Sequence, residues 1–199
     1  YQMPTCSRHG QKPKRQETGL KTTGRATGSR PSIEKFAEAM IEIILYCPEI
    51  PQNTGNIGRI CAFADFRLHL IHPLGFEITD KNLRRAGMDY WKSLDVIEYA
   101  DWESFIRSED RPENIYLLTT HAEKPIWDAS FKAGDGLLFG NEGKGIPQEV
   151  HDWSGDDRLT IPKRKNELRS LNLAVSVGIA SYEALRQITA KNLKNERSG

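Results

Sequence analysis

Residues 136–147 read GLLFGNEGKGIP, and residues 159–185 read LTIPKRKNELRSLNLAVSVGIASYEAL. In each stretch a short apolar run, of the length of a buried strand, is followed by a Gly-rich or polar loop. Loops of this kind at strand ends form the usual ligand crevice of open α/β proteins. The two stretches therefore predict an α/β domain with a binding site at the ends of its strands.

The loop after Phe139 contains three glycines, Gly140, Gly143 and Gly145. Glycine permits a positive φ and lets a ligand approach the backbone closely. The spacing matches neither the G-x-x-x-x-G-K-[ST] pattern of P-loops nor the G-x-G-x-x-G pattern of dinucleotide-binding folds. By itself the loop indicates a strand–turn–helix connection and does not identify a ligand.

Other apolar runs predict the remaining elements of the domain. Strands are expected at 41–46, 67–73, 94–99, 115–120, 137–139 and 159–161. Helices are expected from an N-cap at Asn53 or Thr54 to Ala64, over 102–108 and 147–153, and from Leu173 to about Lys191, with a short basic helix or turn over 80–87. The alternation of strands and helices predicts a mostly parallel, doubly wound sheet.

Charge is divided unevenly along the chain. Residues 1–39 carry eight Lys and Arg against three Glu, a net charge of +5, whereas residues 40–199 carry 20 basic and 24 acidic residues, a net charge of −4. Residues 1–32 are also too poor in large apolar side chains to fold alone. We interpret 1–39 as a disordered basic extension, a targeting leader or translated upstream sequence, preceding a domain at 40–191 and a tail at 192–199.

Several classes of protein are disfavoured by composition. Cys6, Cys47 and Cys61 have no zinc-ligand spacing, and no other metal-ligand cluster is visible, so no metal is expected. Unpaired cysteines favour a reducing, cytoplasmic location, and we interpret Cys61 as a buried, inert thiol. No apolar run approaches the length of a membrane span. Because residues 40–199 are acidic overall, any contact with nucleic acid must use a local basic patch.

Three separated blocks resemble the motifs of the SpoU-type methyltransferases of the SPOUT superfamily. They are NTGNIGR at 53–59, FGNEGKGIP at 139–147, and IP at 161–162 with RSLNLAVS at 169–176. The resemblance covers about 40–187 and is closest to the TrmL-like tRNA wobble-nucleotide 2′-O-methyltransferases. It implies the SPOUT fold, in which the carboxyl-terminal segment of a mostly parallel α/β domain passes through a loop to form a trefoil knot. The knot rests on the resemblance alone, because chain connections almost never thread loops.

The resemblance also implies an activity. Family members transfer a methyl group from S-adenosylmethionine to a ribose 2′-hydroxyl of RNA, releasing S-adenosylhomocysteine, and this subfamily acts on the wobble nucleotide of tRNA. The alternatives are another tRNA loop, ribosomal RNA, or a module that binds RNA without catalysis. The residues that would border the cofactor, with apolar walls suited to adenine, are Leu118, Gly140, Glu142, Ile161, Ser170 and Leu171.

Arg59 matches the family's motif arginine, which is proposed to activate the 2′-hydroxyl. A guanidinium has hydrogen-bond donors but no acceptor. Holding the adjacent phosphate and the developing alkoxide is therefore an easier role than acting as a base. Asn53 and Asn172 match the motif asparagines and would position Arg59 or the ribose, although a helix cap alone would also explain Asn53.

A basic cluster at Lys81, Arg84 and Arg85 precedes Tyr90 and Trp91, and 83–90 also resembles the wobble subfamily. Such a cluster could hold a phosphate and stack a base, or it could form an ordinary solvated face. Arg169, in an unusually basic loop, is a further candidate for RNA binding.

A homodimer is the last implication of the resemblance, because the family pairs through its closing helix. Small residues let two backbones approach closely, and we expect Ala174, Gly178 and Ser181 at the crossing. A loop of the same chain threaded against this helix is the alternative explanation for these residues.

Overall fold

A computed structural model describes residues 40–78, 89–164 and 170–195. The strands are β1 Glu42–Tyr46, β2 Arg67–Ile71, β3 Val96–Tyr99, β4 Ile115–Leu118, β5 Gly136–Phe139 and β6 Arg158–Leu159. The α-helices are α2 Pro51–Ala64, α4 Trp102–Arg107, α5 Gln148–Ser154 and α6 Leu173–Asn195. Two short 3-10 helices are η1 Asp89–Ser93 and η2 Ile126–Asp128. The expected extension at 1–39 and the expected helix or turn over 80–87 lie outside the described residues.

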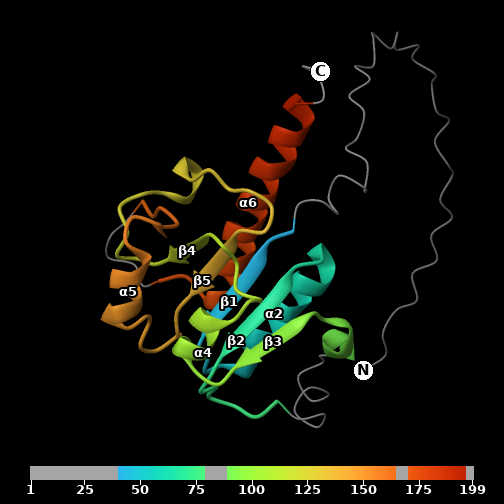
Figure 1. The fold of residues 1–199 in the computed structure, drawn as a ribbon, viewed down its shortest axis with the longest axis vertical. Coiled ribbons are helices and arrows are strands. Elements are labelled where there is room, and N and C mark those ends of the chain that lie inside the picture. The colour runs from blue at the N-terminus through green and yellow to red at the C-terminus, as the bar shows by residue number, and fades with distance from the viewer. Residues whose placement is uncertain (1–39, 79–88, 165–169, 196–199) are drawn as a thin grey trace, which may run out of the picture. The chain divides into compact units, whose positions relative to one another are not determined.

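The strands form one sheet in the order β3-β2-β1-β5-β4-β6, and every neighbouring pair is parallel. Figure 1 shows β1 in the middle of this sheet, with β2 and β5 on its two sides. The predicted parallel, doubly wound α/β fold is confirmed. Because all strands run the same way, their carboxyl ends meet at one edge, where the loops after β1, β4, β5 and β6 lie.

Both faces of the sheet are covered by helices. Ile43 packs in the cluster that α2 and α6 share with the sheet. Its neighbour Ile44 points to the other face and packs with Phe105 of α4 and Val150 of α5. A parallel strand buried on both faces reads as a continuous apolar run, which is why β1 was recognisable from the sequence.

The strand and helix ends differ from the expected ones by a few residues. β4 ends at Leu118 and β6 at Leu159, so the hydroxyl-bearing residues that follow belong to the loops. α6 continues to Asn195, past its expected end near Lys191. No helix in the described ranges is long and apolar enough to cross a membrane.

Cys61 lies on α2 and is fully buried. Desolvation raises the pKa of its thiol to about 12. Because the thiolate is the reactive form of cysteine, this confirms the interpretation of Cys61 as an inert core residue.

The small residues of α6 do not face outward as expected. Ala174 and Ser181 are buried in the chain's own core, and a Cβ added at Gly178 would lie 3.5 Å from Ile60 of α2. The expectation that they meet a second subunit is therefore wrong: they let α6 pack closely on α2. The side chains that α6 does expose are larger and apolar: Val175, Ile179 and Tyr182 are 49%, 40% and 43% exposed.

Candidate active site

The amino end of α2 is capped by a carboxylate from a distant loop. Sequence reasoning placed the N-cap at Asn53 or Thr54; this is wrong, because the helix begins at Pro51 and Ile50 is its N-cap, without a side-chain cap of its own. Glu142 instead accepts hydrogen bonds from the backbone N–H of Glu49 at 2.8 Å and of Ile50 at 3.2 Å. Proline suits the first helical position, and a negative charge there is favourable for the helix dipole.

Glu142 is also the first member of a chain of polar side chains. Its Oε1 accepts from Asn53 Nδ2 at 3.0 Å, and Asn53 Oδ1 accepts from Asn172 Nδ2 at 2.9 Å. Asn172 Oδ1 then accepts from the backbone N–H of Ala174 at 2.9 Å and of Val175 at 3.3 Å, which caps α6. One hydrogen-bonded chain therefore joins the loop after β5, the first turn of α2 and the start of α6.

The hydrogen-bonded series Glu142–Asn53–Asn172, called the polar chain below, holds the three segments that carry these residues together. The sequence alone did not reveal this role. Asn53 is 6% exposed, and both ends of its amide are engaged. Losing either partner would leave a buried polar group of Asn53 without a hydrogen bond, which is unfavourable. The amide of Asn53 therefore holds Glu142 and Asn172 in place. The three blocks singled out in the sequence thus meet at one point.

The loop after β5 is held closed by Asn141, which sequence reasoning missed. Its Nδ2 donates to the carbonyl of Cys47 at 2.6 Å, and its Oδ1 accepts from the backbone N–H groups of Gly143 and Lys144, both at 2.8 Å. Its backbone exchanges two hydrogen bonds with Gly145, whose φ is +72°. An asparagine ahead of glycines is the signature of such an Asx turn, so a signal was present.

Gly140 was expected to be glycine so that a ligand could approach the backbone, but the structure shows that the loop itself leaves no room for a side chain there. A Cβ at this position would lie 2.8 Å from the carbonyl carbon of Gly145 and 2.8 Å from Ile146 Cγ1. The close approach that requires glycine is therefore the loop's own return. A larger residue at Gly140 would distort the loop, whether or not a ligand is bound.

The residues expected around the cofactor come from adjacent strand ends. Leu118 ends β4 and pairs with Phe139 of β5 and Leu159 of β6, so Gly140 and Ile161 follow directly beside it. Ser170 and Leu171 precede α6 and are exposed, Leu171 by 51%. The structure brings Leu118, Gly140 and Ile161 to one edge of the sheet. Their contact with a cofactor stays a prediction.

Arg59 lies on the exposed side of α2. Its Cζ is 5.4 Å from the centre of the Tyr90 ring, a distance that permits a cation–π interaction. The Tyr90 hydroxyl donates to the carbonyl of Gly55, and a Cβ at Gly58 would come within 3.0 Å of Trp91. Gly58 therefore leaves room for η1 to dock on α2, and the hydrogen bond to the Gly55 carbonyl helps to hold Tyr90 under Arg59. The basic candidates Lys81, Arg84, Arg85 and Arg169 lie outside the described residues.

Residues 40–182 match the SpoU rRNA Methylase family. The chain belongs to this family. A tRNA (cytidine(34)-2′-O)-methyltransferase of Saccharophagus degradans is 45% identical over 150 residues, which cover 75% of this chain and 96% of that protein. A solved structure that addresses the 2-OH methylation of C/U34 on tRNA is 42% identical with a TM-score of 0.69, covering 77% of this chain and 99% of its own. An AdoMet-bound rRNA methyltransferase from Sinorhizobium meliloti is 25% identical with a TM-score of 0.65, covering 75% of this chain and 57% of its own.

Membership of the SpoU family confirms the resemblance that the three blocks carried. The solved relatives share the parallel α/β architecture, in agreement with the predicted fold class. The trefoil knot stays a prediction. The polar chain Glu142–Asn53–Asn172 takes one residue from each of the three SpoU blocks.

Proposed function

We propose that this chain is a cytoplasmic, S-adenosylmethionine-dependent tRNA 2′-O-methyltransferase that modifies the wobble nucleotide of the anticodon loop. The observation that carries the proposal is the convergence of the three SpoU blocks through Glu142, Asn53 and Asn172. It is supported by the 45% identity to a tRNA (cytidine(34)-2′-O)-methyltransferase over 96% of that protein. RNA specificity usually targets unpaired loop bases, as in an anticodon loop.

The strand ends supply a fitting set of groups for the cofactor. Leu118, Ile161 and Leu171 would offer apolar surface for adenine, and Ser170, which precedes Leu171 in the sequence, would add a hydroxyl. The bound cofactor supplies a methyl group on a cationic sulfonium, which is a good leaving group. We assign Glu142 an indirect part: its carboxylate is engaged with α2, so it shapes the loop that borders the cofactor.

Methyl transfer requires the 2′-oxygen to be aligned with the methyl group and to lose its proton. We assign Arg59 to the phosphate next to the target ribose and to the negative charge that develops on the 2′-oxygen. The stacking of Arg59 on Tyr90 would hold the guanidinium in place. Asn53 and Asn172 are positioning residues, because each is hydrogen-bonded to its neighbours in the polar chain.

The assay for this proposal is methyl transfer from radiolabelled cofactor to an unmodified tRNA transcript. A second transcript with a 2′-deoxynucleotide at the wobble position is the matched control, because it lacks only the accepting hydroxyl. We expect label in the first transcript and none in the second. Equal labelling of both would contradict the proposed site of transfer.

We further propose a homodimer that pairs through the exposed face of α6. Val175, Ile179 and Tyr182 recur at helical spacing and form an apolar stripe on one side of the helix. A contiguous apolar stripe of this kind is typical of an interaction surface. The family's pairing through its closing helix, inferred from the resemblance, supports the same face.

Replacing Ile179 with aspartate should convert the dimer to a monomer, because a charge would be buried at the centre of the interface. Light scattering at micromolar concentration measures the mass directly. Trp127→Asp is the control, since Trp127 is an exposed apolar residue of η2, outside the stripe. A monomeric wild-type protein, or a dimer that survives Ile179→Asp, would contradict this interface.

A further inference from the structure

A pocket opens at the carboxyl ends of β1 and β2, and the 140–147 loop forms one of its walls. Its volume is about 370 Å³. Tyr46 at the end of β1, Pro73 and Leu74 after β2, and Pro147 supply its apolar surface. Leu118 at the end of β4 and Ile161 after β6, both assigned above to the cofactor, belong to strands on the other side of β5 in the strand order. The 140–147 loop therefore borders both regions.

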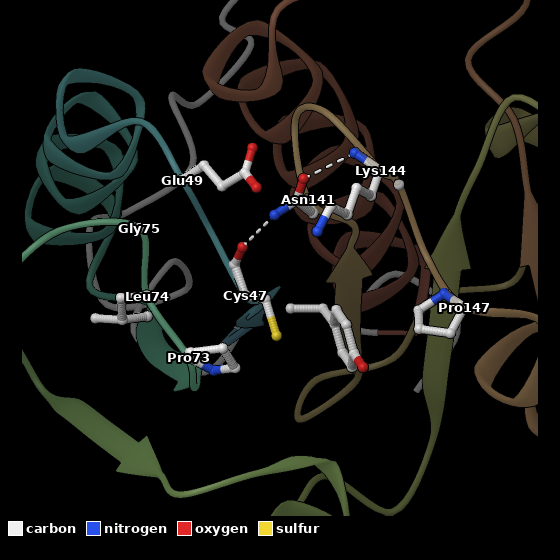
Figure 2. Close-up of a pocket in the computed structure, with 10 residues that line it drawn as sticks. Cys47, Glu49, Pro73, Leu74, Gly75, Asn141, Lys144 and Pro147 are labelled. Carbon is white, nitrogen blue, oxygen red and sulfur yellow. Dashed lines mark hydrogen bonds between the residues drawn. The ribbon is translucent and has the colours of Figure 1, made fainter.

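Two opposite charges enter this pocket from different walls. Figure 2 shows Glu49 reaching toward the 140–147 loop and Lys144 folding back from that loop. Both residues are exposed, and within the described ranges neither side chain forms an ion pair. The pocket thus combines apolar walls with one strong acceptor and one strong donor, a pattern typical of small-molecule recognition.

The chemistry of the pocket favours a flat, polar-edged ring. A simple anion would be repelled by Glu49, and a simple cation by Lys144. A nucleobase presents apolar faces to Tyr46 and the prolines, and it carries donors and acceptors on its edge. Carboxylates accept from the exocyclic amino group of cytosine, and lysine donates to base acceptors.

The pocket also adjoins the polar chain of the active site. The backbone N–H of Glu49 donates to Glu142 at 2.8 Å, and Glu142 is bonded to Asn53 at 3.0 Å. A nucleobase is one bond away from its ribose, so the pocket that receives it must lie next to the place where the 2′-hydroxyl reacts.

We propose that this pocket receives the nucleobase of the target nucleotide, with Glu49 accepting from the exocyclic amino group of cytosine and Lys144 donating to its O2 or N3. The assignment rests on the proposed function. It makes Glu49 a specificity residue: uracil carries a carbonyl where cytosine carries the amino group, and that carbonyl would face a carboxylate. The enzyme should therefore prefer cytidine to uridine at the wobble position.

The test uses anticodon stem-loops with cytidine or uridine at the wobble position and measures kcat/KM for each. Glu49→Gln should lower the preference for cytidine by about tenfold, because glutamine can also donate to the uracil carbonyl. Lys144→Ala should raise KM for both RNAs by about tenfold. The matched controls are Glu113→Gln and Lys132→Ala, two exposed residues in the loops that precede β4 and β5, at the amino edge of the sheet. Neither control should change base preference or KM.

Calorimetry with S-adenosylhomocysteine separates this proposal from a cofactor role for the pocket. Unchanged cofactor affinity in Glu49→Gln and Lys144→Ala supports the base pocket. An unchanged base preference, or a loss of cofactor affinity as large as the effect on RNA, overturns it. Photocrosslinking of wild-type protein to 5-iodocytidine at the wobble position needs no variant: attachment at Tyr46 supports the assignment, and attachment only outside the pocket overturns it. If wild-type protein methylates neither stem-loop, the proposed function itself fails, and the base pocket fails with it.

Discussion

Arg59→Ala should slow single-turnover methyl transfer to unmodified tRNA by on the order of a hundredfold, the usual effect of removing one preorganised group that stabilises developing charge. Affinity for S-adenosylhomocysteine should stay close to wild type, because Arg59 is exposed on α2, its guanidinium lies over Tyr90 of η1, and it is not among the residues assigned to the cofactor. Turnover and calorimetry on the same protein measure the two effects separately.

Arg59→Lys should restore little of the lost rate. A lysine ammonium keeps the charge but cannot reproduce the planar fork that binds a phosphate and stacks on an aromatic ring. Near wild-type turnover in Arg59→Ala would remove Arg59 from the mechanism. Equal losses of rate and cofactor affinity would assign Arg59 to the cofactor site instead.

Glu142→Ala should both destabilise the fold and reduce turnover. The substitution removes the acceptor of three hydrogen bonds and leaves the buried amide of Asn53 without one of its partners. An unsatisfied buried polar group costs about 1–3 kcal/mol. For a domain of this size each kcal/mol corresponds to roughly 2–4 °C in Tm. Turnover should fall as well, because the loop after β5 would no longer be fixed to α2.

A double-mutant cycle with Asn53→Ala tests whether Glu142 and Asn53 act together. If they do, the double variant should be less destabilised than the sum of the single variants, because residues that share a hydrogen bond are not additive. Glu113→Ala, at an exposed residue in the loop before β4, provides the control for loss of a carboxylate. A Glu142→Ala protein with wild-type Tm and turnover would refute the role of the polar chain.

The strands were largely predictable because a parallel sheet covered on both faces leaves continuous apolar runs, as in β1. The start of α2 was not. Its cap comes from Glu142, more than ninety residues away in the sequence, and nothing in the local sequence indicates a contact of that separation. The expected N-cap at Asn53 followed a sound local rule, yet the amide of Asn53 serves a tertiary contact instead.

For the closing helix α6, the sequence predicted the helix but not its packing partner. The small residues Ala174, Gly178 and Ser181 correctly indicated that another element packs closely on this helix. They did not indicate which element, because a neighbouring helix and a second subunit would both require small side chains at the contact. Only the structure shows that Gly178 faces Ile60 of α2. Similarly, the sequence singled out Arg59, whereas its stacking partner Tyr90 lies in a separate element, η1.

Nucleoside mass spectrometry of tRNA treated with the purified protein and S-adenosylmethionine tests the central claim most directly. Digestion with a base-specific ribonuclease before analysis assigns the new methyl group to a position in the chain. We predict one 2′-O-methylated ribose at the wobble nucleotide of the anticodon loop, and none when Arg59 is replaced by alanine at the same reaction time. A methyl group on a base, on a ribose outside the anticodon loop, or on ribosomal RNA in preference to tRNA would contradict the account.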